Sequence, residues 1–142
     1  MVRVLLLEDD PHYREIIERV LLRSAPYAIE SVATEPLAQR ALAEREFDLV
    51  LLDLNIHGRR CWETLARAVR HPCAPAAIMF SCEDTQANVE YALSHGASAF
   101  LPKPLSFLRL QMAVETALQA RGRGPLGEGT APVRPSERTP MC

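Results

Sequence analysis

The sequence predicts an α/β protein with a doubly wound, five-stranded parallel sheet. Five short apolar runs alternate with five segments whose apolar residues recur at three- and four-residue spacing, which is typical of strands alternating with amphipathic helices. The third run, residues 48–52, is almost continuously apolar and predicts a central strand covered on both faces. This run ends in Asp53, a carboxylate that is costly to bury without a partner.

Composition narrows the class of protein. The chain has 142 residues, 48% of them apolar, which is enough for one domain with a hydrophobic core. Its net charge of −2 does not support non-specific binding of nucleic acid. No apolar run approaches the ~18 to 20 residues of a membrane span and no signal-type segment opens the chain, so we expect a cytoplasmic protein. The four cysteines show no CxxC spacing, so we expect them to be buried or free thiols rather than disulfides or zinc ligands: Cys61, Cys73, Cys82 and Cys142.

The first two strand–helix units follow from local patterns. Residues 3–7 form a short apolar run, and Pro11 then opens a helix with one apolar face. Residues 28–33 predict a second, weaker strand. Thr34 is suited to cap the second helix, because a side-chain oxygen there accepts a free backbone N–H.

The middle of the chain predicts a loop, two helices and a strand. The loop covers residues 56–60 and is followed by a third helix over residues 62–69. Residues 76–80 form the fourth apolar run, which Ser81 closes. The fourth helix ends at His95-Gly96, where glycine suits the left-handed position after a helix.

The C-terminal part completes the pattern. Residues 97–101 predict the fifth strand, which Pro102-Lys103-Pro104 closes. The last helix is expected to stop at Gly122, with Phe107, Leu110, Val114 and Leu118 on its inner face. Residues 122–142 are rich in Gly and Pro and poor in large apolar side chains, so we expect a folded domain over residues 1–121 and a disordered tail.

Polar residues at the strand ends predict a site. In an open parallel sheet the carboxyl ends of the strands line one edge, and ligands bind there. The predicted strands bring Asp9 and Asp10, Asp53, Ser81 and Lys103 to that edge. Lys103 is the one Lys among sixteen basic residues, which suggests a compact ammonium that a planar guanidinium would not replace.

Carboxylates gathered in this way predict a Mg²⁺ site, because this cation prefers oxygen ligands. We expect Asp10, Asp53 and the backbone carbonyl of Asn55 as ligands, with Asp9 acting through water. Asp53 could then attack phosphorus and become an aspartyl phosphate, while Ser81 and Lys103 hold the phosphoryl oxygens.

Each residue also has a structural explanation. Asp10 could cap the first helix, Ser81 could cap the fourth, Lys103 could be a surface charge and Asp53 could start a turn. Four such coincidences at one sheet edge favour the chemical interpretation.

From Met1 to about Arg121, the chain resembles the receiver domain of bacterial response regulators. The matching motifs lie at residues 5–10, 51–54, 80–81 and 96–104. The resemblance implies a flavodoxin-like (βα)5 fold with strand order 2-1-3-4-5 and a cis bond between Lys103 and Pro104. It also implies that Asp53 takes a phosphoryl group, with Mg²⁺, from a histidine kinase, a phosphotransfer protein or a small phosphodonor. The chain departs from the family pattern at three places: His57 stands where family members often have Pro, Arg60-Cys61 where they often have Asp-Gly, and Cys82 where a small residue usually follows the hydroxyl.

The resemblance further implies a switch and a lifetime. Ser81 and the switch aromatic Phe100 would transmit phosphorylation to a face made by the fourth helix, fifth strand and fifth helix. Asn55 and Glu83, two residues beyond Asp53 and Ser81, would guide the water that removes the phosphoryl group. This pair is similar to that of chemotaxis regulators that signal briefly.

The predicted function is a stand-alone, phosphorylation-controlled signalling switch that acts by binding an unidentified downstream protein, without direct nucleic-acid binding. It would be no enzyme beyond catalysing its own phosphorylation and dephosphorylation, and the resemblance allows a phosphorylation-dependent dimer. One alternative is the N-terminal receiver of a truncated DNA-binding transcription regulator. Another is a phosphatase with an aspartate nucleophile, but those enzymes have Asp-x-Asp after the first strand, where this chain has Asp9-Asp10.

Overall fold

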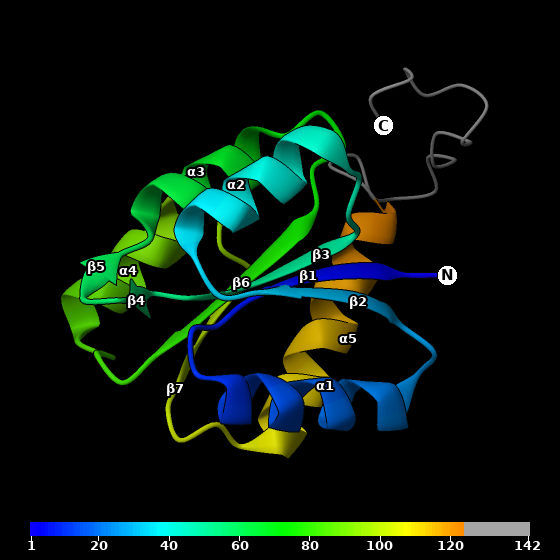
Figure 1. The fold of residues 1–142 in the computed structure, drawn as a ribbon, viewed down its shortest axis with the longest axis horizontal. Coiled ribbons are helices and arrows are strands. Elements are labelled where there is room, and N and C mark those ends of the chain that lie inside the picture. Colours follow the sequence, from blue (N-terminus) through cyan, green and yellow to red (C-terminus); the bar gives the residue numbers. More distant parts are fainter. Residues whose placement is uncertain (124–142) are drawn as a thin grey trace.

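The structure is a computed structural model that describes residues 1–123. The chain alternates strands and helices, as predicted (Figure 1). The strands are β1 (Arg3–Leu7), β2 (Ala28–Val32), β3 (Leu49–Asp53), β4 (Asn55–Ile56), β5 (Arg59–Arg60), β6 (Ala76–Ser81) and β7 (Ala99–Pro102). The helices are α1 (Pro11–Ser24), α2 (Glu35–Glu44), α3 (Trp62–Arg70), α4 (Gln86–Ser94) and α5 (Phe107–Arg123).

Five parallel strands form the central sheet in the order β2-β1-β3-β6-β7. Strands β4 and β5 form a separate antiparallel pair, so this order is the predicted 2-1-3-4-5 when the main strands alone are counted. Every residue of β3 is buried, which confirms the expectation of a central strand.

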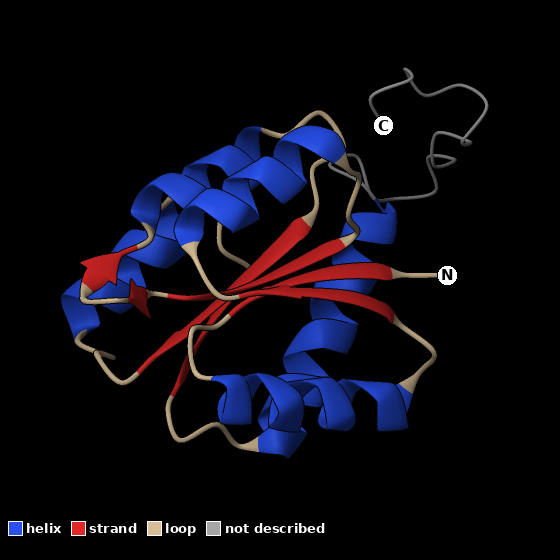
Figure 2. Cartoon of the chain, in the orientation of Figure 1, coloured by secondary structure: helices blue, strands red, loops and turns tan. Residues whose placement is uncertain are grey.

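Helices cover both faces of the sheet (Figure 2). Successive strand residues point to opposite faces, so Leu5 and Leu7 of β1 pack beneath α2, α3 and α4, while Val4 and Leu6 pack against α1 and α5. The strand alternation therefore divides the core into two apolar layers. This alternation also decides which acid after β1 faces which layer.

Local signals fix the helix boundaries. The Thr34 side chain accepts the N–H of Leu37 at the start of α2, as predicted, and Thr85 does the same for Asn88 at the start of α4. Gly96 follows α4 with a φ of +106°, a conformation that a side chain disfavours.

The predicted loop over residues 56–60 is a hairpin. His57 and Gly58 have φ values of +51° and +76°, as a two-residue type I′ turn between β4 and β5 requires. Proline, fixed near −65°, could not occupy position 57 in this turn. The turn therefore requires a residue other than proline at position 57, which agrees with the departure from the family pattern at His57.

The last helix differs from its prediction in two details. It runs to Arg123 rather than stopping at Gly122, and Phe107 is 41% exposed instead of facing the core. Leu110, Val114 and Ala117 form the buried face. The predicted tail lies almost wholly outside the described residues. Among residues 1–123, no helix is both long and apolar enough to cross a membrane.

Candidate functional site

The carboxyl edge of the sheet gathers most of the predicted site. Asp53 is the last residue of β3, and Ser81 is the last residue of β6. Ser81 pairs with Pro102 across the β6–β7 ladder, and its carbonyl accepts the N–H of Lys103 at 3.0 Å. This register places Lys103 directly beyond the strand end, beside Asp53.

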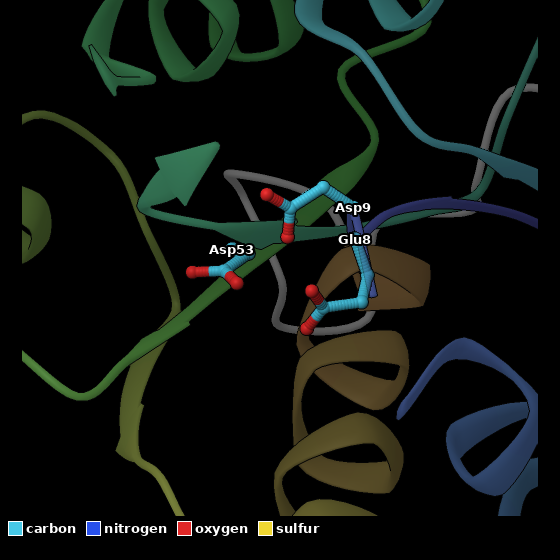
Figure 3. Close-up of side chains that lie close together, drawn as sticks. All are labelled: Glu8, Asp9 and Asp53. Atoms are coloured by element: carbon cyan, nitrogen blue, oxygen red, sulfur yellow. The ribbon is translucent and has the colours of Figure 1, made fainter. Parts of the chain in front are cut away.

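Three carboxylates meet at this edge. One oxygen each of Glu8, Asp9 and Asp53 lie within 4.8 Å of one another (Figure 3). Glu8 is fully buried and Asp53 is 4% exposed, whereas Asp9 is half-buried. Because the alternation of β1 continues beyond Leu7, Glu8 follows Leu6 toward the α1/α5 layer and Asp9 follows Leu7 toward the other.

The ammonium of Lys103 neutralises part of this charge. Its Nζ lies 2.6 Å from a Glu8 oxygen and 2.8 Å from Asp53 Oδ2, and also over the rings of Tyr13 (4.4 Å to the centroid) and Phe80 (5.5 Å). Burial lowers the pKa of Lys103, but the hydrogen bonds to Asp53 and Glu8 outweigh burial and hold that pKa above its usual value. The Lys103-Pro104 bond is cis, as the resemblance implies.

The two acids after β1 differ in their electrostatics. Burial raises the pKa of Glu8 to about 7, and the hydrogen bond from Lys103 only partly opposes this effect. Burial also acts to raise the pKa of Asp9, but hydrogen bonds with the His57 N–H and with Glu8 hold it below its usual range. The N–H of His57 lies 3.1 Å from Asp9 Oδ2, so the hairpin turn itself contributes a donor to the site.

The structure contradicts the prediction that Asp10 joins Asp9 and Asp53 at the site. Asp10 is exposed, and its Oδ1 accepts the N–H groups of His12 (2.9 Å) and Tyr13 (3.4 Å) as the cap of α1. The acidic pair that meets Asp53 is therefore Glu8 and Asp9, one residue earlier than predicted. The physical reason is that the chain has turned into α1 by residue 10, so the Asp10 carboxylate is occupied by helix N–H groups.

The Ser81 hydroxyl is held from two sides. Its oxygen accepts the side-chain amide of Asn55 and the backbone N–H of Glu83, both at 2.9 Å. Its one hydrogen therefore remains for donation. The structural alternative for Ser81 as the cap of α4 is wrong, since Thr85 has that position.

The two residues predicted to guide water both have partners. The backbone N–H of Asn55 donates to Asp53 Oδ1 at 3.0 Å, and its side chain binds Ser81. The Glu83 carboxylate lies 3.0 Å from a guanidinium nitrogen of Arg60, in an ion pair between β5 and the segment after β6. Arg60 occupies one of the positions where the chain departs from the family pattern.

Phe100 lies in β7, half-buried against the layer beneath α2, α3 and α4. Cys82, beside Ser81, is exposed, whereas Cys61 is buried at the start of α3, and burial raises its pKa to about 12.

The acidic cluster fits a hard divalent cation. Its donors are all carboxylate oxygens, the ligands that such a cation prefers. Glu8 is the residue that sequence analysis missed. The signal that could have found it was the alternation of β1, because residue 8 continues the side of Val4 and Leu6, which packs against α1 and α5.

Comparisons with known proteins show the family to which the chain belongs. The family model described as the response regulator receiver domain matches residues 4–115. The transcriptional regulatory protein MalR of Bacillus subtilis (strain 168) is 30% identical over 115 residues, which are 80% of this chain and 49% of MalR. The transcriptional regulatory protein ZraR of Klebsiella oxytoca is 33% identical over 118 residues, which are 82% of this chain and 26% of ZraR. The chain thus spans about half or a quarter of these relatives.

Solved structures show the same fold. The signal receiver domain of a putative Luxo repressor protein from Vibrio parahaemolyticus has a TM-score of 0.80 at 24% identity and covers 91% of this chain and 98% of its own. A CheY-like receiver domain protein from Methanospirillum hungatei JF-1 has a TM-score of 0.76 at 23% identity. The match covers 83% of this chain and 94% of the Methanospirillum chain. Receiver domains are phosphoacceptor regulators of two-component signalling and bind Mg²⁺ at an acidic pocket. The chain belongs to the response regulator receiver domain family.

Proposed function

We propose that Asp53 accepts a phosphoryl group and that this chain is a phosphorylation-controlled switch. The donor is a phosphohistidine of a histidine kinase or phosphotransfer protein, or a small phosphodonor. The observation that carries the proposal is the 2.8 Å contact of the one Lys ammonium with Asp53 at the carboxyl edge of the sheet. With a phosphohistidine donor, an Asp53 oxygen forms the new bond to phosphorus as the P–N bond breaks, and the released imidazole takes up a proton; with phosphoramidate the leaving group is ammonia.

The residues at this edge suit that transfer. Asp9, Asp53 and the backbone carbonyl of Asn55 would hold Mg²⁺, with Glu8 beside them in the cluster. When bound, the cation supplies positive charge to the phosphoryl oxygens. Lys103 offers an ammonium to one oxygen, and Ser81 offers the hydrogen left free by its two accepted bonds. The chain would catalyse only its own phosphorylation and the hydrolysis of its own acyl phosphate.

Labelling tests this proposal. Asp53→Asn should abolish incorporation of phosphate from phosphoramidate, as should removal of Mg²⁺ by a chelator. Asp84→Asn, which changes an exposed carboxylate, is the matched control and should be labelled like the wild type. Lys103→Arg should impair the switch, because a planar guanidinium cannot take the place of a point charge between Glu8 and Asp53. Phosphate label that persists in Asp53→Asn and maps to Asp9 or Ser81 would contradict the assignment of Asp53 as the phosphoacceptor.

The proposed switch runs from Ser81 to Phe100. A phosphoryl oxygen on Asp53 would draw the Ser81 hydroxyl away from the Asn55 amide, and Phe100 would turn further into the core beneath α4. Output then passes through the face of α4, β7 and α5, to which a downstream protein binds. On this face α5 exposes the apolar side chains of Leu108 and Met112, and Met112 lines a surface pocket together with Ala99 of β7.

Beryllofluoride, which mimics the phosphoryl group, tests the output. It should shift amide signals over α4, β7 and α5 in the wild type but not in Asp53→Asn. A pull-down with and without beryllofluoride would then identify the partner, and a second copy of this chain is one of its outcomes. Unchanged amide signals on that face would refute the proposed route.

The lifetime of the phosphoryl group is proposed to be short. Asn55 is small and polar, and its amide becomes available to orient water once Ser81 moves toward the phosphoryl group. Glu83 acts on the same water path, and Arg60 holds its carboxylate. Substituting Arg or Lys at Asn55, or a large apolar residue at Glu83, should slow decay of the acyl phosphate. Wild-type decay as slow as that of these variants would contradict the proposal.

A transcriptional role is the second candidate. The names of MalR and ZraR are consistent with it, since both are called transcriptional regulatory proteins and both are longer than the shared segment. In this alternative the receiver acts within a longer polypeptide that carries a DNA-binding output domain. The position of the stop codon in the gene decides between the two.

A further inference from the structure

Tyr13 connects α1 to the segment that carries Lys103. Its hydroxyl oxygen accepts the backbone N–H of Leu105 at 2.8 Å, and its ring centroid lies 4.4 Å from Lys103 Nζ. Tyr13 and Leu105 are 92 residues apart in sequence. One half-buried side chain thus contacts both ends of the three-residue segment 103–105.

The start of α1 is itself tied to the site. The Glu8 carboxylate accepts the N–H of Asp10 at 3.1 Å, and the Arg14 guanidinium donates to the Glu8 carbonyl at 2.8 Å. Glu8 is also one of the two acids that bind the Lys103 ammonium. Tyr13 is therefore fixed relative to the same framework that Lys103 must reach.

The Lys103 side chain needs such a guide. Its flexible four-carbon stem ends in a strongly hydrated ammonium, which two carboxylates share at 2.6 and 2.8 Å. In the proposed transfer, that ammonium has to follow charge that moves from Asp53 to a phosphoryl oxygen. An aromatic face attracts a cation without fixing its hydrogen bonds, so the ring limits where the ammonium lies and leaves its donors free.

We propose that Tyr13 is a positioning residue for Lys103: its ring holds the ammonium at the site and its hydroxyl holds the 103–105 segment. This inference rests on the proposed function for its catalytic consequence, but the position of Lys103 can be measured independently. The competing explanation is packing alone, since Tyr13 also lies against the α1/α5 core layer. Packing requires neither the hydroxyl acceptor nor the ring beneath the ammonium.

The chain offers an unusually clean probe, because Lys103 is its only lysine. With ¹³C-labelled lysine, the protein gives one lysine spin system in NMR spectra. Ring currents from Tyr13 should shift the Lys103 Hε signals upfield in the wild type and in Tyr13→Phe. The shift should shrink in Tyr13→Leu, with a remainder from Phe80, whose ring centroid lies 5.5 Å from Nζ. In Tyr13→Phe the Leu105 amide should exchange faster with solvent, because it loses its acceptor.

Activity gives the second readout. Tyr13→Leu should lower the maximal rate of labelling by phosphoramidate about 2- to 30-fold, the range expected for loss of a cation–π contact, with a smaller effect in Tyr13→Phe. Tyr27→Leu is the matched control. Tyr27 is also half-buried against the α1/α5 layer but directly precedes β2, at the opposite end of the strands, so its variant should keep the wild-type Lys103 signal and rate.

The outcomes separate the two proposals. An unchanged Lys103 signal in Tyr13→Leu and an unchanged Leu105 exchange rate in Tyr13→Phe would overturn the positioning role, even if Asp53 is labelled. Unlabelled wild-type protein whose Lys103 signal still depends on Tyr13 would overturn the proposed function and support the positioning. If Tyr13→Leu does not fold, Tyr13→Phe still decides through the exchange of the Leu105 amide.

Discussion

Glu8→Gln should stabilise the metal-free protein, and more so at high pH. Glu8 is fully buried beside Asp53, and its pKa lies at about 7 instead of 4.5. That displacement corresponds to about 3 kcal/mol of unfavourable free energy for the ionised carboxylate in the folded state. Glutamine of the same shape avoids this cost. It can still accept one hydrogen bond, so we subtract about 1 kcal/mol for the second bond that Glu8 accepts.

The sign of the pH dependence follows from the raised pKa. Below a pH of about 4.5, Glu8 is protonated in both the folded and the unfolded state and carries no penalty. Between pH values of about 4.5 and 7, Glu8 ionises in the unfolded state first, so the folded state loses stability as pH rises. Wild-type stability in the presence of a chelator should therefore fall by about 2 kcal/mol more than that of Glu8→Gln between pH 5 and pH 8. The variant should equal the wild type near pH 5 and exceed it by about 2 kcal/mol at pH 8.

Urea unfolding at pH 5 and pH 8 in EDTA measures both values. Glu15→Gln is the control, because Glu15 pairs with Arg19 at the surface and its loss should change stability by less than about 0.5 kcal/mol at either pH. A difference between Glu8→Gln and the wild type that is the same at pH 5 and pH 8 would refute the reasoning about Glu8.

Two further predictions concern packing and thiol chemistry. Gly96→Ala should destabilise the fold by about 2 to 4 kcal/mol, because φ is +106° and the new Cβ would lie 2.8 Å from Val69 Cγ2. Urea unfolding measures this loss, and an unchanged midpoint of the unfolding transition would contradict the close approach to Val69. Iodoacetamide at pH 8 should label Cys82 and leave Cys61 unmodified in a Cys142→Ser background, because Cys82 is exposed and burial raises the pKa of Cys61 to about 12. Mass spectrometry that finds Cys61 modified first would show that this thiol is accessible.

The sequence by itself determined the elements and most of the site. Apolar periodicity, the cap at Thr34 and the glycine at position 96 act within a few residues, so they identify strands and helices without knowledge of the rest of the chain. Parallel strands then place their carboxyl ends together by topology alone. This is why Asp53, Ser81 and Lys103 could be brought to one edge before any coordinates were known.

Only the tertiary structure decided which neighbours those residues have. Whether Glu8 or Asp10 joins the cluster depends on the residue at which β1 gives way to the α1 cap, and one step along a strand reverses the face of a side chain. The Arg60–Glu83 pair and the contacts of Tyr13 with residues 103–105 join segments 23 and about 90 residues apart, which no local pattern records. Such contacts arise from the packing of whole elements against one another, and for that reason they could be found only once the fold was assembled.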